Sequence, residues 1–90
     1  MKKGECMRVL CRKATEAEKA YMKRFDYWES PVTEFDYRYD HDETFLLIEG
    51  QAVIEYEEGS VSFGAGDILY CPEGLECRWK VLLPVRKYLR

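Results

Sequence analysis

The second half of the chain alternates apolar and polar residues in short runs, and this period of two constrains the fold more than any other feature. In residues 35–40, three aromatic residues share one face of an extended chain and charged residues share the other. The stretches "SVSF" and "CRWKV" repeat the pattern, and glycine-containing turns separate the runs at 58–59, 64–66 and 74. Successive side chains of a strand point to opposite faces, so such runs are typical of an all-β sandwich or barrel.

One helix is predicted ahead of these strands, near residues 15–24. Thr15 can cap it, and Glu18, three residues later, completes a capping box. The stretch before it, "MRVLCRK", is interpreted as a short strand that places three side chains on one side: Met7, Val9 and Cys11. The stretch after it, "YWESPV", is predicted to be a loop, because the residue before Pro31 avoids helical geometry.

The length and composition favour one small cytoplasmic domain. Ninety residues allow a single domain, 1–90, with one modest core. No apolar run approaches the roughly 20 residues of a membrane span, and the chain opens with no secretory pattern, so we expect no membrane partner. The cysteines form no CxxC pair and no secreted framework, so they are expected to be reduced thiols, mostly buried: Cys6, Cys11, Cys71 and Cys77.

The charges are unevenly distributed along the chain. Most acidic residues lie between Glu29 and Glu76, where Arg38 is the single lysine or arginine, while the other basic residues lie in the two flanks. The net charge of −3 argues against a nucleic-acid partner. The middle segment either forms an acidic face or is compensated when folding brings the basic ends beside it, and we favour compensation.

Two spacings give the second half a more specific pattern. Gly66 is followed after five residues by Pro72-Glu73-Gly74, and then, after two more, by Cys77. Upstream, Glu43 is followed after six residues by Gly50. Both spacings, in this order, resemble the two motifs of the cupin family, which implies a single antiparallel β-barrel (jelly roll).

The resemblance is closer to one subgroup, the small single-domain cupins of mostly unassigned function. This subgroup is related to the cupin domains of ureidoglycine aminohydrolase and of ethanolamine-utilisation proteins. The stretches "WESPVTEFDYRYDHDET", "LIEGQAVIEYEEG", "GAGDILYCPEGLECRW" and "PVRKY" carry it, and it covers residues 28–88. Small cupins commonly pair, and a small barrel has sheet edges to protect, so a homodimer is expected.

The metal-binding pattern of the family is largely absent from this chain. Metal cupins typically use His-x-His, Glu and a further His. With a spacer of three residues before Glu43, the His-x-His positions fall on Tyr37 and Tyr39, which we prefer. With a spacer of four residues, they fall on Asp36 and Arg38. The later His position holds Cys77, and the position of an expected Asn holds Val81. Only Glu43 is unchanged, so no metal cofactor is predicted; a divalent metal, if bound, would use Glu43 and Cys77. His41 is either a displaced ligand or acid/base group, or a solvated turn residue, and we favour the turn residue.

The period of two predicts which side chains face inward. They form a carboxylate and a thiol in an aromatic cage: Tyr37, Tyr39, Glu43, Phe45, Leu47, Cys77 and Trp79. Burial is expected to favour the protonated acid at Glu43 unless a cation or tyrosine hydroxyl satisfies it, so Glu43→Gln is expected to cost little stability. Glu43 is then a candidate catalytic general base or a seat for an ammonium ligand. The alternative is that the aromatic residues simply fill a small barrel.

Two functions remain open from the sequence. The first is a binding module that holds a small organic molecule in this pocket without metal. The second is an enzyme for a small nitrogen-containing or sugar-like metabolite, aminohydrolase- or isomerase-like, with Glu43 as the acid/base group. The loss of the histidines favours the first, and Glu43 supports the second.

Overall fold

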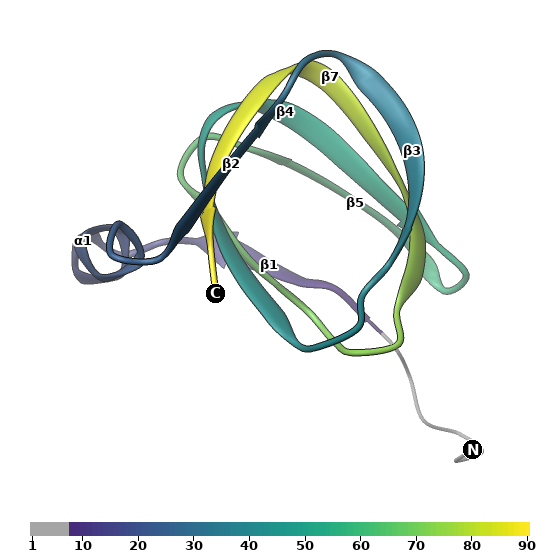
Figure 1. Cartoon of the computed structure of the whole chain (residues 1–90), viewed down its shortest axis with the longest axis horizontal. Coiled ribbons are helices and arrows are strands. Elements are labelled where there is room, and N and C mark those ends of the chain that lie inside the picture. Colours follow the sequence, from purple (N-terminus) through teal and green to yellow (C-terminus); the bar gives the residue numbers. More distant parts are fainter. Residues whose placement is uncertain (1–7) are drawn as a thin grey trace.

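The computed structural model describes residues 8–90 as a curled antiparallel sheet with one short helix on its outside (Figure 1). The elements in chain order are β1 (Leu10–Lys13), α1 (Glu16–Met22), β2 (Asp26–Ser30), β3 (Thr33–Arg38), β4 (Glu43–Tyr56), β5 (Gly59–Gly64), β6 (Asp67–Cys71) and β7 (Glu76–Leu89). The strand order is β1-β6-β4-β7-β2, with β3 also paired to β7 and β5 to β4. The all-β cupin prediction is confirmed, although the sheet curls without closing into a complete barrel.

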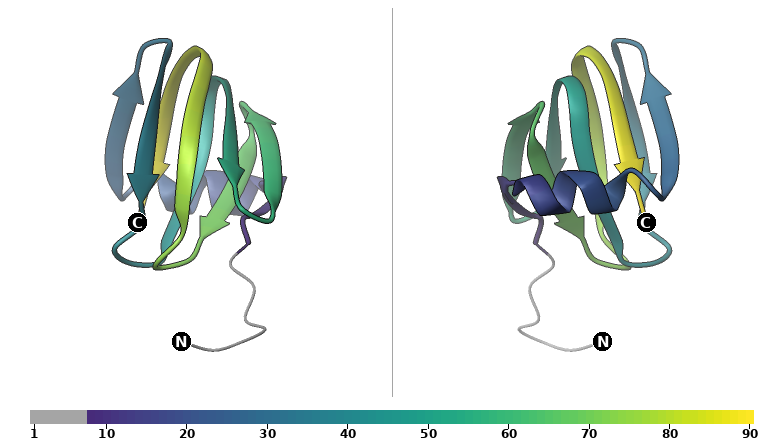
Figure 2. Two further views of the ribbon diagram at one scale, coloured as in Figure 1. Left: turned by 90° about the vertical axis from the view of Figure 1, so that its right-hand side faces the viewer. Right: turned by 90° about the vertical axis from the view of Figure 1, so that its left-hand side faces the viewer.

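Helix α1 begins as the sequence predicts. The Thr15 hydroxyl oxygen accepts a hydrogen bond from the backbone N–H of Glu18. The Glu18 carboxylate in turn accepts a hydrogen bond from the backbone N–H of Thr15. The helix lies across the outer face of the sheet (Figure 2), where Met22 packs with Leu46 and Ile68 in a small second core. With seven residues it is the only helix between residues 8 and 90, and it is too short to span a membrane.

The two longest strands, β4 and β7, form the spine of the sheet. From sequence alone, "TFLLIEG" is interpreted as a strand that ends at Gly50 and "QAVIEYEEGS" as the next strand. The structure instead continues through Gly50 as one strand, with register shifts against β7. Gly50 has a φ of 97°, and a Cβ on it would lie 2.2 Å from the Pro84 carbonyl oxygen. Only glycine fits here, because the Cβ of any other residue would meet the backbone of β7.

The segment after the helix is a strand, so the prediction of a loop over "YWESPV" is wrong. Residues 26–30 form β2, which pairs with β7 and places Trp28 opposite Lys87. The residue before a proline favours extended geometry, which suits a strand end as well as a loop. β2 ends one path of the sheet and Pro31 lies just beyond it, where a missing N–H does no harm.

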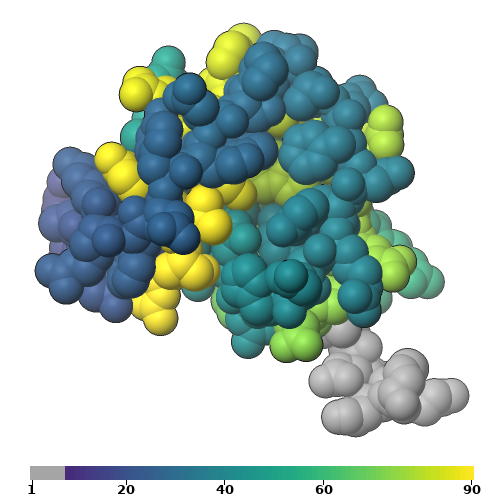
Figure 3. All heavy atoms as spheres, viewed as in Figure 1, coloured from purple at the N-terminus to yellow at the C-terminus, as the bar shows by residue number. Residues whose placement is uncertain are grey.

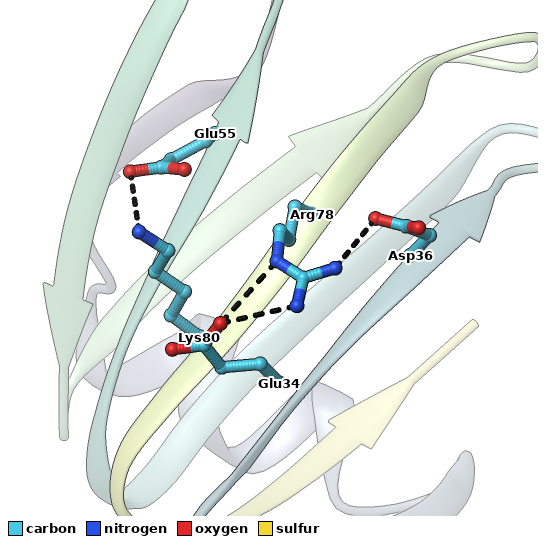
Figure 4. Close-up of polar contacts among 5 residues, drawn as sticks. All are labelled: Glu34, Asp36, Glu55, Arg78 and Lys80. Atoms are coloured by element: carbon cyan, nitrogen blue, oxygen red, sulfur yellow. Dashed lines mark hydrogen bonds and ion pairs between the residues drawn. The ribbon is translucent and has the colours of Figure 1, made fainter.

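Two basic residues of β7, Arg78 and Lys80, lie beside acidic residues of the neighbouring strands (Figure 4). Arg78 pairs with Glu34 and Asp36 of β3, at 3.1 and 2.9 Å, and Lys80 pairs with Glu55 of β4 at 3.1 Å. Folding therefore brings the basic flank beside the acidic middle, as predicted. Each exposed pair is worth little in stability, about 0–1 kcal/mol, but together they favour this strand register.

The cysteines differ in their environments. Cys71 and Cys77 are buried and unbridged, as predicted. Cys11 is exposed on β1. Cys6 and Met7 lie outside the described residues.

Candidate functional site

A cavity of about 120 Å³ opens inside the curl of the sheet, on the face shown in Figure 3. On this face the blue atoms of β2 and β3 meet the yellow end of β7 and the teal start of β4. Most of the lining is aromatic, with one acid and one base: Trp28, Phe35, Tyr37, Tyr39, Glu43, Trp79, Lys87 and Leu89.

A buried ion pair forms the polar part of this lining. The Lys87 ammonium donates to the Glu43 carboxylate with a Nζ–Oε2 distance of 3.1 Å, and the two side chains are only 7% and 5% exposed. Burial lowers the pKa of Lys87 below its ordinary value, while Glu43 opposes this shift. The pair therefore holds two charges in a place that strongly disfavours either one alone.

Three aromatic rings surround the ammonium. The Lys87 Nζ lies 4.8 Å from the ring centroid of Trp28, 4.2 Å from that of Phe45 and 4.6 Å from that of Trp79. These are cation–π distances, and the rings replace part of the hydration that the cation loses. We call Lys87, Glu43 and these three rings the lysine box.

The strand pattern explains how a lysine comes to lie here. β7 turns Trp79 and Val81 inward, bulges near Pro84, and then turns Val85 and Lys87 inward. Neither Lys87 nor Trp28 is among the pocket residues predicted from the sequence, although both line the cavity. The available signal was the period of two, which places a lysine two residues after the apolar Val85.

A hydrogen bond between the side chains of Trp79 and Tyr39 holds another part of the cavity wall in place. The Trp79 indole N–H donates to the Tyr39 hydroxyl at 3.2 Å, and both side chains are 1% exposed. Phe35 stacks on Trp79 with an interplanar angle of 8°. Burial raises the pKa of Tyr39 far above its ordinary range, so its hydroxyl stays protonated.

The predicted pocket residues fall into two groups. Tyr37, Tyr39, Glu43 and Trp79 line the cavity, and Phe45 packs behind the Lys87 ammonium. Cys77 lies instead on a neighbouring open depression, where burial raises the pKa of its thiol to about 11. A protonated thiol is a poor nucleophile at neutral pH. The catalytic role of Glu43 stays a prediction.

The expected cationic ligand meets a different arrangement. The aromatic cage already holds an ammonium group, that of Lys87, and Glu43 already has a cation as its partner. A second positive charge would be repelled there. The site therefore suits an uncharged ligand better than a cationic one.

The donor set does not fit the metal that cupins commonly carry. A divalent ion at Glu43 would lie beside the Lys87 ammonium, and the Cys77 thiol and Tyr37 phenol both have raised pKa values, so they hold their protons. His41 does not line the cavity and pairs in an exposed turn with Asp40, at 2.6 Å. Across residues 8–90, no three His, Cys, Asp or Glu side chains converge on a common point suited to a metal.

Comparison with known proteins identifies the family. Residues 16–88 match the model of the EutQ-like cupin domain. A DUF861 family protein from Thermotoga maritima has a similar structure, with a TM-score of 0.86 and 37% identity over 92% of this chain and 98% of that one. No curated protein matches the sequence significantly.

More distant structures share the fold. A putative ethanolamine utilization protein Q from Salmonella typhimurium has a TM-score of 0.65 and 16% identity, over 90% of this chain and 66% of that one. The EutQ protein of Clostridium difficile has a TM-score of 0.64 and 22% identity, over 90% and 65%. The predicted relation to ethanolamine-utilisation cupins is thus confirmed, whereas that to ureidoglycine aminohydrolase stays a prediction. The chain belongs to the EutQ-like cupin domain family.

Proposed function

We propose that this domain binds a small, uncharged organic molecule in its aromatic cavity, without a metal, and that Lys87 provides the positive charge of the site. The observation that carries this proposal is the buried Lys87–Glu43 pair in the wall of the cavity. An ammonium has three N–H donors, and within residues 8–90 one protein acceptor, Glu43, lies in hydrogen-bond range of Lys87. A ligand oxygen can accept another.

The size and charge of the cavity narrow the class of ligand. At about 120 Å³ it is smaller than a cavity of about 150 Å³ that holds benzene, so only a molecule of a few non-hydrogen atoms fits. A carboxylate ligand would face the Glu43 charge, and an ammonium ligand would face Lys87. A neutral carbonyl, amide or hydroxyl compound avoids both repulsions and offers an oxygen to Lys87.

Acetamide and propionamide are suitable probes, because they are small, neutral and chemically inert toward lysine. The chain has two tryptophans, Trp28 and Trp79, and both line the cavity. We expect a saturable shift of their indole N–H signals in NMR spectra on titration with either amide, and a weaker response to acetate. The Lys87→Met variant should lose the response. Lys80→Met, which removes a partly exposed lysine of the same strand, should keep the response.

Two results would contradict the proposal. One is the absence of a saturable shift with both amides. The other is one equivalent of zinc, nickel or iron in protein purified without an affinity tag, removed by Glu43→Gln, because the lysine would then not be the cation of the site.

A further inference from the structure

We propose that Lys87 is a nucleophile that forms an imine with a small aldehyde or ketone in the cavity, with Glu43 as its proton-transfer partner. Because it uses the same cavity, this reactivity rests on the function proposed above. It goes beyond binding, since it assigns a covalent step and a substrate class, small carbonyl compounds.

The first support is the position of the amine. Lys87 is one of the residues that line the cavity, so a ligand there lies against its side chain. The inward line of β7 is otherwise apolar around it, with Val81 2% exposed and Val85 1% exposed. A buried ion pair contributes little or no stability compared with apolar packing. A lysine among the inward-facing residues of β7 therefore indicates a functional role and not a contribution to stability.

The second support is the chemistry of the neighbours. A lysine nucleophile must lose a proton before it attacks, and Glu43 lies 3.1 Å from its Nζ, within direct proton-transfer distance. Burial also lowers the pKa of Lys87, so the neutral amine is easier to reach than on an exposed lysine. The two buried thiols do not compete, because burial raises the pKa of Cys71 to about 12 and that of Cys77 to about 11.

The step balances within the pair itself. The Lys87 ammonium gives one proton to the Glu43 carboxylate, and the neutral amine forms a C–N bond with the carbonyl carbon. A proton moves from nitrogen to the former carbonyl oxygen, giving a carbinolamine. Glu43 then returns its proton to that hydroxyl, which leaves as water while the C=N bond forms. Overall, an ammonium and a carbonyl compound give an iminium and water, and Glu43 ends as a carboxylate.

The lysine box suits the product as well as the starting pair. An iminium carries the same single positive charge as the ammonium, so the rings of Trp28, Phe45 and Trp79 stabilise it in the same way. Glu43 keeps a cationic partner throughout. The buried position also limits access of bulk water, which would hydrolyse the imine.

Reductive trapping tests this reactivity on the wild-type protein. The protein is incubated near neutral pH with propionaldehyde and cyanoborohydride, which reduces an imine to a stable propyl-lysine, and labelled lysines are located by peptide mass spectrometry. Lys80 and Lys13, both on the surface, serve as internal references. Because burial lowers the pKa of Lys87 and Glu43 lies within proton-transfer distance of its Nζ, Lys87 should be labelled faster than either reference lysine.

Two controls separate a site from simple amine chemistry. Benzaldehyde is too large for the cavity and should label Lys80 and Lys13 without the preference for Lys87. Glu43→Gln favours the neutral amine but removes the acid that protonates the leaving hydroxyl of the carbinolamine, so it should slow the labelling of Lys87 and leave the two references unchanged. Labelling of Lys87 at or below the rate of the references with propionaldehyde overturns the proposal, as does an equal preference for Lys87 with benzaldehyde.

The results with amides and with aldehydes are independent. Amide binding without preferential labelling of Lys87 overturns the imine step and keeps the binding function. Preferential labelling without amide binding supports the imine step and corrects the class of ligand from amide-like to carbonyl compounds. The absence of both overturns the two proposals together.

Discussion

Glu43→Gln tests the buried ion pair most directly, because it removes a charge with little change of shape. The Lys87 ammonium would stay buried, at 7% side-chain exposure, without the carboxylate that lies 3.1 Å away. Coulomb's law with an effective dielectric constant of about 20 assigns the pair roughly 5 kcal/mol. The sequence alone predicts that this substitution costs little; the partner found in the structure reverses that expectation.

The loss has an upper limit, because the lysine can release its proton instead. Neutralising an amine with a reference pKa of about 10.4 at pH 7 costs about 4.6 kcal/mol. Breaking a buried pair typically costs about 3–5 kcal/mol, so we expect Glu43→Gln to lower the free energy of unfolding by about 3–4 kcal/mol at pH 7.

The dependence on pH has a defined sign. Burial lowers the pKa of Lys87 in the wild type while Glu43 opposes this shift, so the loss of the carboxylate should lower that pKa further, and the folded variant should bind fewer protons than the unfolded chain. Stability then rises with pH, and the deficit relative to wild type should be smaller at a pH of about 9.5 than at pH 7. Urea unfolding at both pH values measures this.

The chain offers a matched control on the same two strands. Glu55 and Lys80 also lie 3.1 Å apart between β4 and β7, but they are 45% and 33% exposed (Figure 4). Glu55→Gln should cost no more than about 1 kcal/mol. The double variant Glu43→Gln/Lys87→Met should recover most of the lost stability, because it leaves no unpaired charge. A Glu43→Gln cost equal to that of Glu55→Gln would refute the energetic reasoning.

Two further predictions concern Gly50 and the thiols. Gly50→Ala should destabilise the fold by more than about 3 kcal/mol in thermal unfolding, because the new Cβ meets backbone atoms at a positive φ. Gly59→Ala is the control: a Cβ there meets open space, so stability should change by less than about 0.5 kcal/mol. Iodoacetamide near pH 8 should alkylate exposed Cys11 well before buried Cys71 and Cys77. Equal stabilities of the two alanine variants, or early labelling of Cys71, would contradict these expectations.

Much of the fold is readable from the sequence, because strands and turns are local patterns. The alternation in 35–40 and the capping box of Thr15 and Glu18 predict their elements with near-correct bounds. The sequence does not show that the strand continues through Gly50, because the constraint on Gly50 is the close approach of Pro84, which lies far along the chain. A glycine between two alternating runs looks the same whether the strand ends or continues there.

The candidate site is only half readable for a similar reason. Tyr37, Tyr39, Glu43 and Trp79 follow from the period of two and the cupin spacings. Trp28 and Lys87 come from β2 and the last strand, and their meeting depends on the β2–β7 register. The pairing of β4 with β7 brings Lys87 to Glu43, and with it sets the charge of the cavity.

The dependence of β2 and β3 on β7 also affects how the chain acquires its structure during synthesis. Both strands pair with β7 alone, so residues 26–38 have no sheet partner until residues 76–89 have left the ribosome. The β4–β5 hairpin and β6 can pair earlier, while the aromatic side chains of β2 and β3 are still exposed to water. Such long-range pairing slows folding, and it leaves the apolar surface of the nascent chain exposed until its last strand arrives.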